Sequence, residues 1–337
     1  MAADRTHRGD RGRNSRTRTL TRVLLAPMLV LAGCGAPDAP GTPPGALESR
    51  PASPSPRPTT APALFPMTLT DDDGVSLTLR SAPERIVTWG PSNTEILFAL
   101  GEGERIVGVS GPFDDHPAEA KTIEEIGGRG GVEPNVERVV ALEPDLVLNG
   151  FRGGEEWKAR LRDLGVSVFS IYAEDFDGVL DDIRTVGMLI GAPGVADALT
   201  GDMAAREEEI QAAVAAEPRV SCFFEAGYPE LYTVGPQDFP FDLLLRAGCD
   251  PVTEEADAPY PLWSIERLVA DDPEVYILTS EAGASPMQVA QRPGFAGIAA
   301  VRAGRVYLID SDLVTRPGPR VIEGMEQLAE FLHPDVT

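Results

Sequence analysis

Residues 135–148 read NVERVVALEPDLVL, and residues 264–277 read SIERLVADDPEVYI. The two segments align without a gap at a separation of 129 positions, and Glu137 matches Glu266 in that alignment. Apolar residues match apolar residues along the segments, and a proline falls at the same place in both copies. A repeat of this kind indicates that the chain contains two similar structural units.

Each copy predicts one short helix followed by one strand. Val136, Val139 and Val140 stand at positions i, i+3 and i+4, so one face of the helix is expected to be buried, and Glu137 is expected to face solvent. The proline ends the helix, and the apolar run after it is typical of a buried parallel strand. We therefore expect one exposed glutamate at an equivalent place in each of two lobes.

Alternating strands and helices continue on both sides of the two copies, which predicts parallel sheets covered by helices on both faces. We expect an α/β fold with two Rossmann-like lobes, residues 65–192 and residues 218–337. Residues 193–217 are rich in alanine and glutamate, and we expect them to form one backbone helix, about 35 Å long, that joins the lobes.

Two local predictions concern the start of the first lobe. Alternating apolar residues around the Asp-Asp-Gly turn at 72–74 predict an edge hairpin over residues 67–79. Either Ser92 or Asn93 is expected to cap the helix that begins near Pro91.

The N-terminus is typical of an export signal. Residues 1–22 carry seven arginines, and the apolar run that follows is too short to span a membrane. The run ends in Leu-Ala-Gly-Cys34, which resembles the lipobox of bacterial lipoproteins, so residues 1–33 are expected to be a signal peptide and Cys34 the lipidation site. The alternative is an ordinary secretory signal cleaved near Ala32.

Residues 34–64 are rich in Pro, Ala, Ser and Thr, and this composition predicts a disordered tether. Without residues 1–33, which hold seven arginines and two aspartates, the net charge changes from −24 to −29. Such an acidic chain argues against nucleic acid and anionic lipid as partners. We expect an extracytoplasmic body that is anchored to the outer face of the cell membrane by its lipid alone.

Cys222 and Cys249 are the cysteines left in the predicted folded part. They could pair in an oxidising compartment, but their spacing does not require it, and buried free thiols are the favoured interpretation.

Five segments together resemble the substrate-binding proteins of vitamin B12 and iron–siderophore ABC importers, and the resemblance covers residues 80–333. They read APERIVTWGPSNTEILFALG, GGVEPNVERVVALEPDLVL, FRGG, YPLWSIERLVADDPE and RPGPRVIEG, in the order of the family. The resemblance implies a two-lobed receptor without enzymatic activity or resident cofactor, which we expect to be a monomer. It also implies that Glu137 and Glu266 dock onto arginines of the membrane permease dimer. The alternative for these glutamates is that they are solvated carboxylates favoured by the helix dipole.

The ligand is expected between the lobes, at the carboxyl ends of the parallel strands. Flat aromatic side chains after those strands suit a large, rigid, partly apolar ligand. Four of the candidates match an aromatic, an aromatic, an aspartate and an arginine of B12 receptors: Phe151, Tyr260, Asp312 and Arg316. The other candidates are Trp89, Phe113, Arg129, Arg152 and Tyr228.

The candidate arginines leave a second ligand class open. Arg129, Arg152 and Arg316 could together bind an anionic ferric siderophore or the propionates of haem. Arg129 also departs from the B12 receptors, which tend to have an aromatic residue there. The sequence thus favours a corrinoid and keeps ferric siderophore or haem as the alternative.

Two other classes of function fit the sequence less well. A receptor for bare Zn or Mn needs several histidines, and only His116 and His333 follow the predicted signal peptide, so no metal site is expected. The sequence also lacks G-x-S-x-G, H-E-x-x-H and P-loop motifs, which argues against an enzyme.

Overall fold

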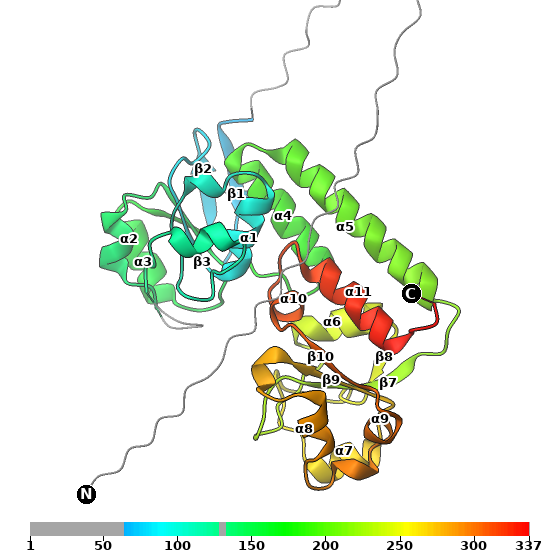
Figure 1. The fold of residues 1–337 in the computed structure, drawn as a ribbon. Helices are drawn as coiled ribbons and strands as arrows, with labels where there is room; N and C mark the ends of the chain where they lie inside the picture. The colour runs from blue at the N-terminus through cyan, green and yellow to red at the C-terminus, as the bar shows by residue number, and fades with distance from the viewer. Residues whose placement is uncertain (1–63, 128–132, 337) are drawn as a thin grey trace, which may run out of the picture. The chain divides into compact units, whose positions relative to one another are not determined.

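The computed structural model describes residues 64–127 and 133–336 (Figure 1). The predicted signal peptide, Cys34, nearly all of the predicted tether and Arg129 lie outside the described residues. No helix within the described ranges is both long enough and apolar enough to cross a membrane.

The first lobe contains a four-stranded parallel sheet of order β4-β3-β5-β6. The predicted hairpin is confirmed, because β1 pairs antiparallel with β2. The strands are β1 Met67–Thr70, β2 Ser76–Leu79, β3 Ile86–Trp89, β4 Ile106–Gly108, β5 Leu146–Asn149 and β6 Ser167–Ser170. The helices are α1 Pro91–Ala99, α2 Val136–Ala141, α3 Glu155–Asp163 and α4 Phe176–Ile190, with short 3-10 turns at Gly103–Arg105 and Ala118–Thr122.

The second lobe contains a parallel sheet of order β10-β9-β7-β8. Its strands are β7 Val220–Glu225, β8 Cys249–Pro251, β9 Val275–Thr279 and β10 Val306–Ile309. Its helices are α6 Phe239–Arg246, α7 Ile265–Asp271, α8 Pro286–Ala290, α9 Ala299–Ala303, α10 Asp312–Thr315 and α11 Val321–Leu332, with 3-10 turns at Ser280–Ala282 and Phe295–Gly297. Numbered along the chain within each sheet, both sheets have the order 2-1-3-4. The predicted fold class, α/β with parallel sheets in two lobes, is confirmed.

The two copies of the repeated segment also share details of their backbone. Asn135 and Ser264 are the N-caps of α2 and α7, and each side chain accepts a hydrogen bond from the backbone N–H three residues later. After each helix, one acidic residue takes a left-handed conformation, Glu143 with φ 48° and Asp272 with φ 44°. Each lobe therefore uses the same device to turn from helix to strand.

Helix α5, Pro193–Val214, connects the two lobes in the chain. It packs against α4 and against α11, so it contacts helices that precede and follow it (Figure 1). Arg206 on α5 holds Glu326 on α11 with two hydrogen bonds of 2.8 Å. Such a bidentate pair fixes both distance and orientation between the two helices.

Two local predictions are wrong. Helix α1 begins at Pro91, one residue after Gly90, so Ser92 and Asn93 lie inside the helix and are buried instead of capping it. Cys222 and Cys249 are not free thiols but form a disulfide between β7 and β8, with their Cα atoms 5.9 Å apart. The short strand β8 was not predicted from the sequence. Only its pairing with β7 places the two cysteines next to each other.

Candidate ligand-binding site

In a sheet of order 2-1-3-4 the connections that follow the first and third strands run toward opposite edges of the sheet. A crevice opens between these connections at the carboxyl ends of the two strands, and ligands of α/β proteins bind there. In the first lobe these strands are β3 and β5, and in the second they are β7 and β9. The residues just after these strands are therefore the first candidates for ligand contact.

In the first lobe the loops after β3 and β5 touch each other. A Cβ atom on Gly90, which has φ 131°, would lie 3.3 Å from Cα of Gly150, so neither side of this contact has room for a larger residue. Phe151 follows at once and is partly exposed. Asn149 orients it, because the buried side-chain amide donates to the Phe151 carbonyl at 2.7 Å and accepts from the Phe151 N–H at 3.2 Å.

Trp89 supports Phe151 from the core. It is only 2% exposed, and its ring meets the Phe151 ring edge to face with 6.1 Å between centroids. A ligand would therefore meet Phe151 and not the face of Trp89.

The loop after β4 carries Phe113, which is 36% exposed. Its neighbour Asp114 is buried and accepts hydrogen bonds from Thr94 and Ser110, both at 2.5 Å, and from the Gly111 N–H at 3.0 Å. Burial raises the pKa of Asp114, and the three donors act against that rise. These bonds tie the loop that presents Phe113 to helix α1.

Arg152 is exposed and already has two partners in its own lobe. Its guanidinium forms an ion pair with Glu174 and lies over the ring of Tyr172, 4.9 Å from the ring centre. Glu174 therefore partly neutralises the positive charge of Arg152, which was predicted to bind an anionic ligand.

In the second lobe Tyr228 follows β7 and is 41% exposed. Its ring stacks on the guanidinium of Arg292, whose carbon lies 3.6 Å from the ring centre. Arg292 is itself fixed by the fully buried Glu225, with bonds of 2.5 and 2.9 Å. The Tyr276 hydroxyl also donates to Glu225, and burial together with that carboxylate raises the pKa of Tyr276.

Tyr260 lies beyond β8 in a left-handed conformation, with φ 43°, and is 47% exposed. Its backbone N–H donates to Asp238 at 2.9 Å. Tyr232 forms isolated bridges with Gly227 and with Leu262, so the loop that carries Tyr228 is connected to the segment that follows Tyr260.

Asp312 and Arg316 belong to a network that joins the lobes. Arg316 contacts Asp312 at 2.7 Å, Asp115 at 3.2 Å and Glu95 at 3.3 Å. Arg320 holds the same Glu95 with bonds of 2.6 and 2.8 Å. Glu95 is on α1 and only 4% exposed, so a buried carboxylate of the first lobe is matched by two guanidiniums of the second.

The predicted docking glutamates are both exposed, each in the first turn of its helix. Within residues 64–127 and 133–336 neither Glu137 nor Glu266 has an ion-pair or hydrogen-bond partner. Both carboxylates are therefore available to a partner.

The structure thus brings Trp89 together with Phe151, and Asp312 together with Arg316, but it attaches Arg152 to a local pair. Five residues that hold the candidates in place were not predicted from the sequence: Glu95, Asn149, Glu225, Arg292 and Arg320. Buried charge pairs join residues that lie far apart in the chain. No regular spacing in the sequence predicts which of these residues will pair.

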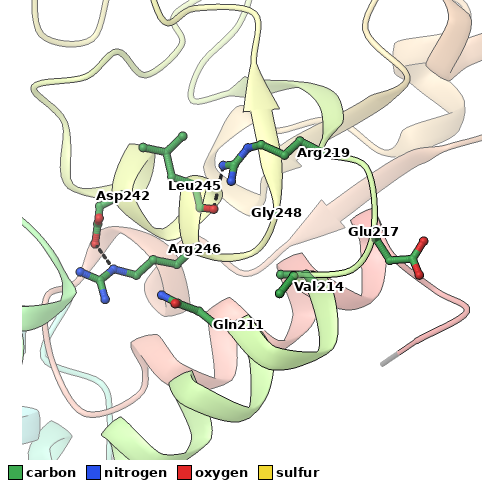
Figure 2. A pocket seen from close by; sticks show the side chains of 9 residues that line it. Gln211, Val214, Glu217, Arg219, Asp242, Leu245, Arg246 and Gly248 are labelled. Atoms are coloured by element: carbon green, nitrogen blue, oxygen red, sulfur yellow. Dashed lines mark hydrogen bonds and ion pairs between the residues drawn. The ribbon is translucent and has the colours of Figure 1, made fainter.

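Two pockets lie away from these aromatic residues. One of about 490 Å³ opens between the lobes and is lined in part by Glu95, His116 and Arg320. Another of about 610 Å³ lies at the amino end of β7, where Arg219 donates to the Leu245 carbonyl and Arg246 pairs with Asp242 (Figure 2). That second pocket is at the end of the sheet opposite to the candidate residues, and both of its guanidiniums have partners.

The sequence matches the family described as periplasmic binding protein over residues 86–313. The chain belongs to this family of binding proteins.

Two relatives and two solved structures illustrate the range of the family. The chain is 33% identical to an uncharacterized ABC transporter substrate-binding lipoprotein of Bacillus subtilis, over 93% of this chain and 96% of the relative. It is 32% identical to a cobalamin-binding protein of Halobacterium salinarum, over 80% of this chain and 74% of the relative.

Among solved structures, the periplasmic vitamin B12 binding protein of Vibrio cholerae is 25% identical with a TM-score of 0.65, over 74% of this chain and 96% of that one. A periplasmic heme binding protein of Pseudomonas aeruginosa is 27% identical with a TM-score of 0.66, over 76% and 94%. These two proteins share the fold, but their names give different ligands, vitamin B12 and heme.

Proposed function

We propose that this protein is the extracytoplasmic receptor of an ABC importer, that it binds a corrinoid such as cobalamin between its lobes, and that it delivers the ligand to the membrane permease. The observation that carries the proposal is the pair of aromatic side chains at the two strand-order switch points, Phe151 and Tyr228. Both are partly exposed, and both are held by buried polar groups. Rigid aromatic faces suit a large, rigid macrocycle because little conformational entropy is lost on binding.

The charges near the candidate residues favour a corrinoid over an anionic chelate. Arg152 is paired with Glu174, and Arg292 with Glu225. In the network between the lobes, Arg316 and Arg320 face three carboxylates, Glu95, Asp115 and Asp312. An anionic siderophore or the propionates of haem would have to displace these carboxylates before they could use the arginines.

The remaining parts of the proposal concern the membrane. Lipid on Cys34 anchors the chain to the outer face of the cell membrane, and the following segment lets the body reach the permease. Glu137 and Glu266 dock onto basic residues of the two permease subunits. Ligand bridges the lobes, the long α5 restricts their motion to a small hinge, and the docked permease takes up the ligand as the lobes part. The protein acts as a monomer and as a carrier, not as a catalyst.

The ligand is tested by following tryptophan fluorescence while the protein is titrated with cyanocobalamin, haem and a panel of ferric siderophores. Saturable quenching by cyanocobalamin alone is expected. Saturable binding of haem or of a siderophore, with none of cyanocobalamin, would replace the corrinoid by the alternative ligand of the same family.

The docking role is tested separately by the variant Glu137→Arg/Glu266→Arg. Uptake of the ligand by cells should be lost, because like charges then face the permease, while affinity for the ligand in solution should stay unchanged. A parallel loss of ligand affinity would show that the glutamates serve the binding site, and normal uptake would refute their docking role.

A further inference from the structure

Helices α2 and α7 occupy equivalent places in the two lobes but differ in how much apolar surface they expose. In the first lobe Val136 is 8% exposed and packs in the core with Ile126. The matching residue in the second lobe, Ile265, is 38% exposed. The fold itself therefore does not require this position to be open.

Three apolar side chains on α7 or in the segment just before it are exposed. Leu262 is 62% exposed, and Val269 is 38% exposed like Ile265. At the position that matches Leu262 the first lobe has Glu133, which is charged and exposed. We call the surface of Leu262, Ile265 and Val269 the α7 patch. Glu266 extends from the same helix, next to the α7 patch, and its carboxylate has no partner among the residues that the structure describes.

We propose that the α7 patch is an apolar contact surface for the importer permease, and that the two lobes consequently dock unequally, because the second lobe buries more apolar area beside its glutamate than the first. This inference rests on the proposed function. The partner surface is expected to present a basic residue surrounded by apolar side chains, which is the arrangement that complements Glu266 within the α7 patch.

Two other occupants fit the chemistry less well. A second copy of this chain would bring two α7 helices together and place the unpaired Glu266 carboxylates near each other, which costs free energy by repulsion. A lipid surface with anionic headgroups would likewise repel Glu266. A partner protein with a basic side chain in its contact surface would attract Glu266, so neither repulsion arises.

The inference is tested with the variant Leu262→Ser/Val269→Ser and the importer, permease and ATPase subunits together, reconstituted in nanodiscs. The dissociation constant of the receptor for the importer should rise about tenfold or more, because the apolar core of a contact surface holds most of its binding energy. The loss should persist at high salt, whereas the loss caused by Glu266→Gln should shrink there because salt screens charges. Affinity for the ligand should not change.

The matched control is Leu164→Ser/Val195→Ser, which removes two other apolar side chains that are 56% and 48% exposed. It should bind the importer like the wild type. An unchanged dissociation constant for Leu262→Ser/Val269→Ser, an equal loss in the control, or a matching loss of ligand affinity would each overturn the inference. If the wild type itself does not bind the importer, the proposed function fails first, and that result is distinct from the other three.

Discussion

At the scale of single residues, the carboxyl group of Asp182 on α4 has a raised pKa. Burial, the nearby Asp72 carboxylate and then Asp181 raise its pKa to about 7, while a backbone hydrogen bond from Ala173 lowers it. In the unfolded chain an aspartate titrates near 3.9. Between these two values the folded state binds the proton more tightly, so Asp182 makes the protein less stable as the pH rises from about 4 to about 7.

We therefore predict that Asp182→Asn stabilises the protein in neutral and alkaline solution. The shift itself corresponds to an upper limit of about 4 kcal/mol above pH 7, and partial exposure reduces the expected gain to about 1–2 kcal/mol. The gain should be small at pH 4.5 and full at pH 8, as measured by urea unfolding at both values. Asp163→Asn, at an exposed position of α3, is the control and should change stability little at either pH. If Asp182→Asn raised the free energy of unfolding equally at both pH values, the raised pKa of Asp182 would be contradicted.

Predictions for single residues were confirmed where the helical period alone decides whether a side chain is buried or exposed. Glu137 and Glu266 follow the helical period and are exposed as expected. Ser92 and Asn93 failed as caps because Pro91 can occupy the first helical position itself, and this moves the start of the helix ahead of them. Glu225 and Arg292 could not be paired from the sequence, since 67 positions separate them and many other carboxylates compete for the same arginine.

At the scale of elements, the disulfide connects the short strand β8 to β7 in the second lobe. The two cysteines are 27 positions apart, and the enclosed segment contains the whole of α6. A cross-link over a segment of this length restricts the unfolded chain, which stabilises the folded state by about 3.5 kcal/mol in the loop-entropy description.

The corresponding prediction is that Cys222→Ala/Cys249→Ala lowers the free energy of unfolding by about 2–4 kcal/mol without changing the fold. Urea unfolding with and without a reducing agent measures this change. The reduced wild type should approach the stability of the variant, and the variant should not respond to the reductant. Equal stability of the oxidised and reduced wild type would mean that the bond adds nothing to the fold.

Most elements were predictable because their hydrophobic period is long enough to recognise. Helix α5 spans Pro193–Val214, only a few residues short of the predicted range 193–217. The short elements β8, α8 and α9 have three to five residues each, too few for a period to appear. They form because neighbouring parts of the second lobe hold them.

At the scale of the whole molecule, Glu95 is the residue through which the first lobe holds two arginines of the second. We predict that Glu95→Gln loosens the contact between the lobes, because a neutral amide cannot balance the partly buried Arg316 and Arg320. Hydrogen exchange should become faster in α10 and the start of α11, and small-angle scattering should detect a larger radius of gyration without ligand.

The matched control for that experiment is Glu209→Gln, at an exposed position on α5. It should leave both hydrogen exchange and scattering unchanged. Unchanged exchange in the Glu95→Gln variant would mean that the network is not what sets the spacing of the lobes, and that α5 with its packing on α4 and α11 suffices.

The common strand order of the two sheets has a consequence for the origin of the molecule. Identical order alone could arise twice, but Glu143 and Asp272 share a rare backbone conformation at matching positions, and Asn135 and Ser264 cap matching helices. Agreement at that level of detail is what duplication of one ancestral lobe would produce. The ancestral unit was then about the size of one lobe, and the exposed apolar side chains of α7 and the buried Val136 of α2 differ because the two lobes diverged after they were joined.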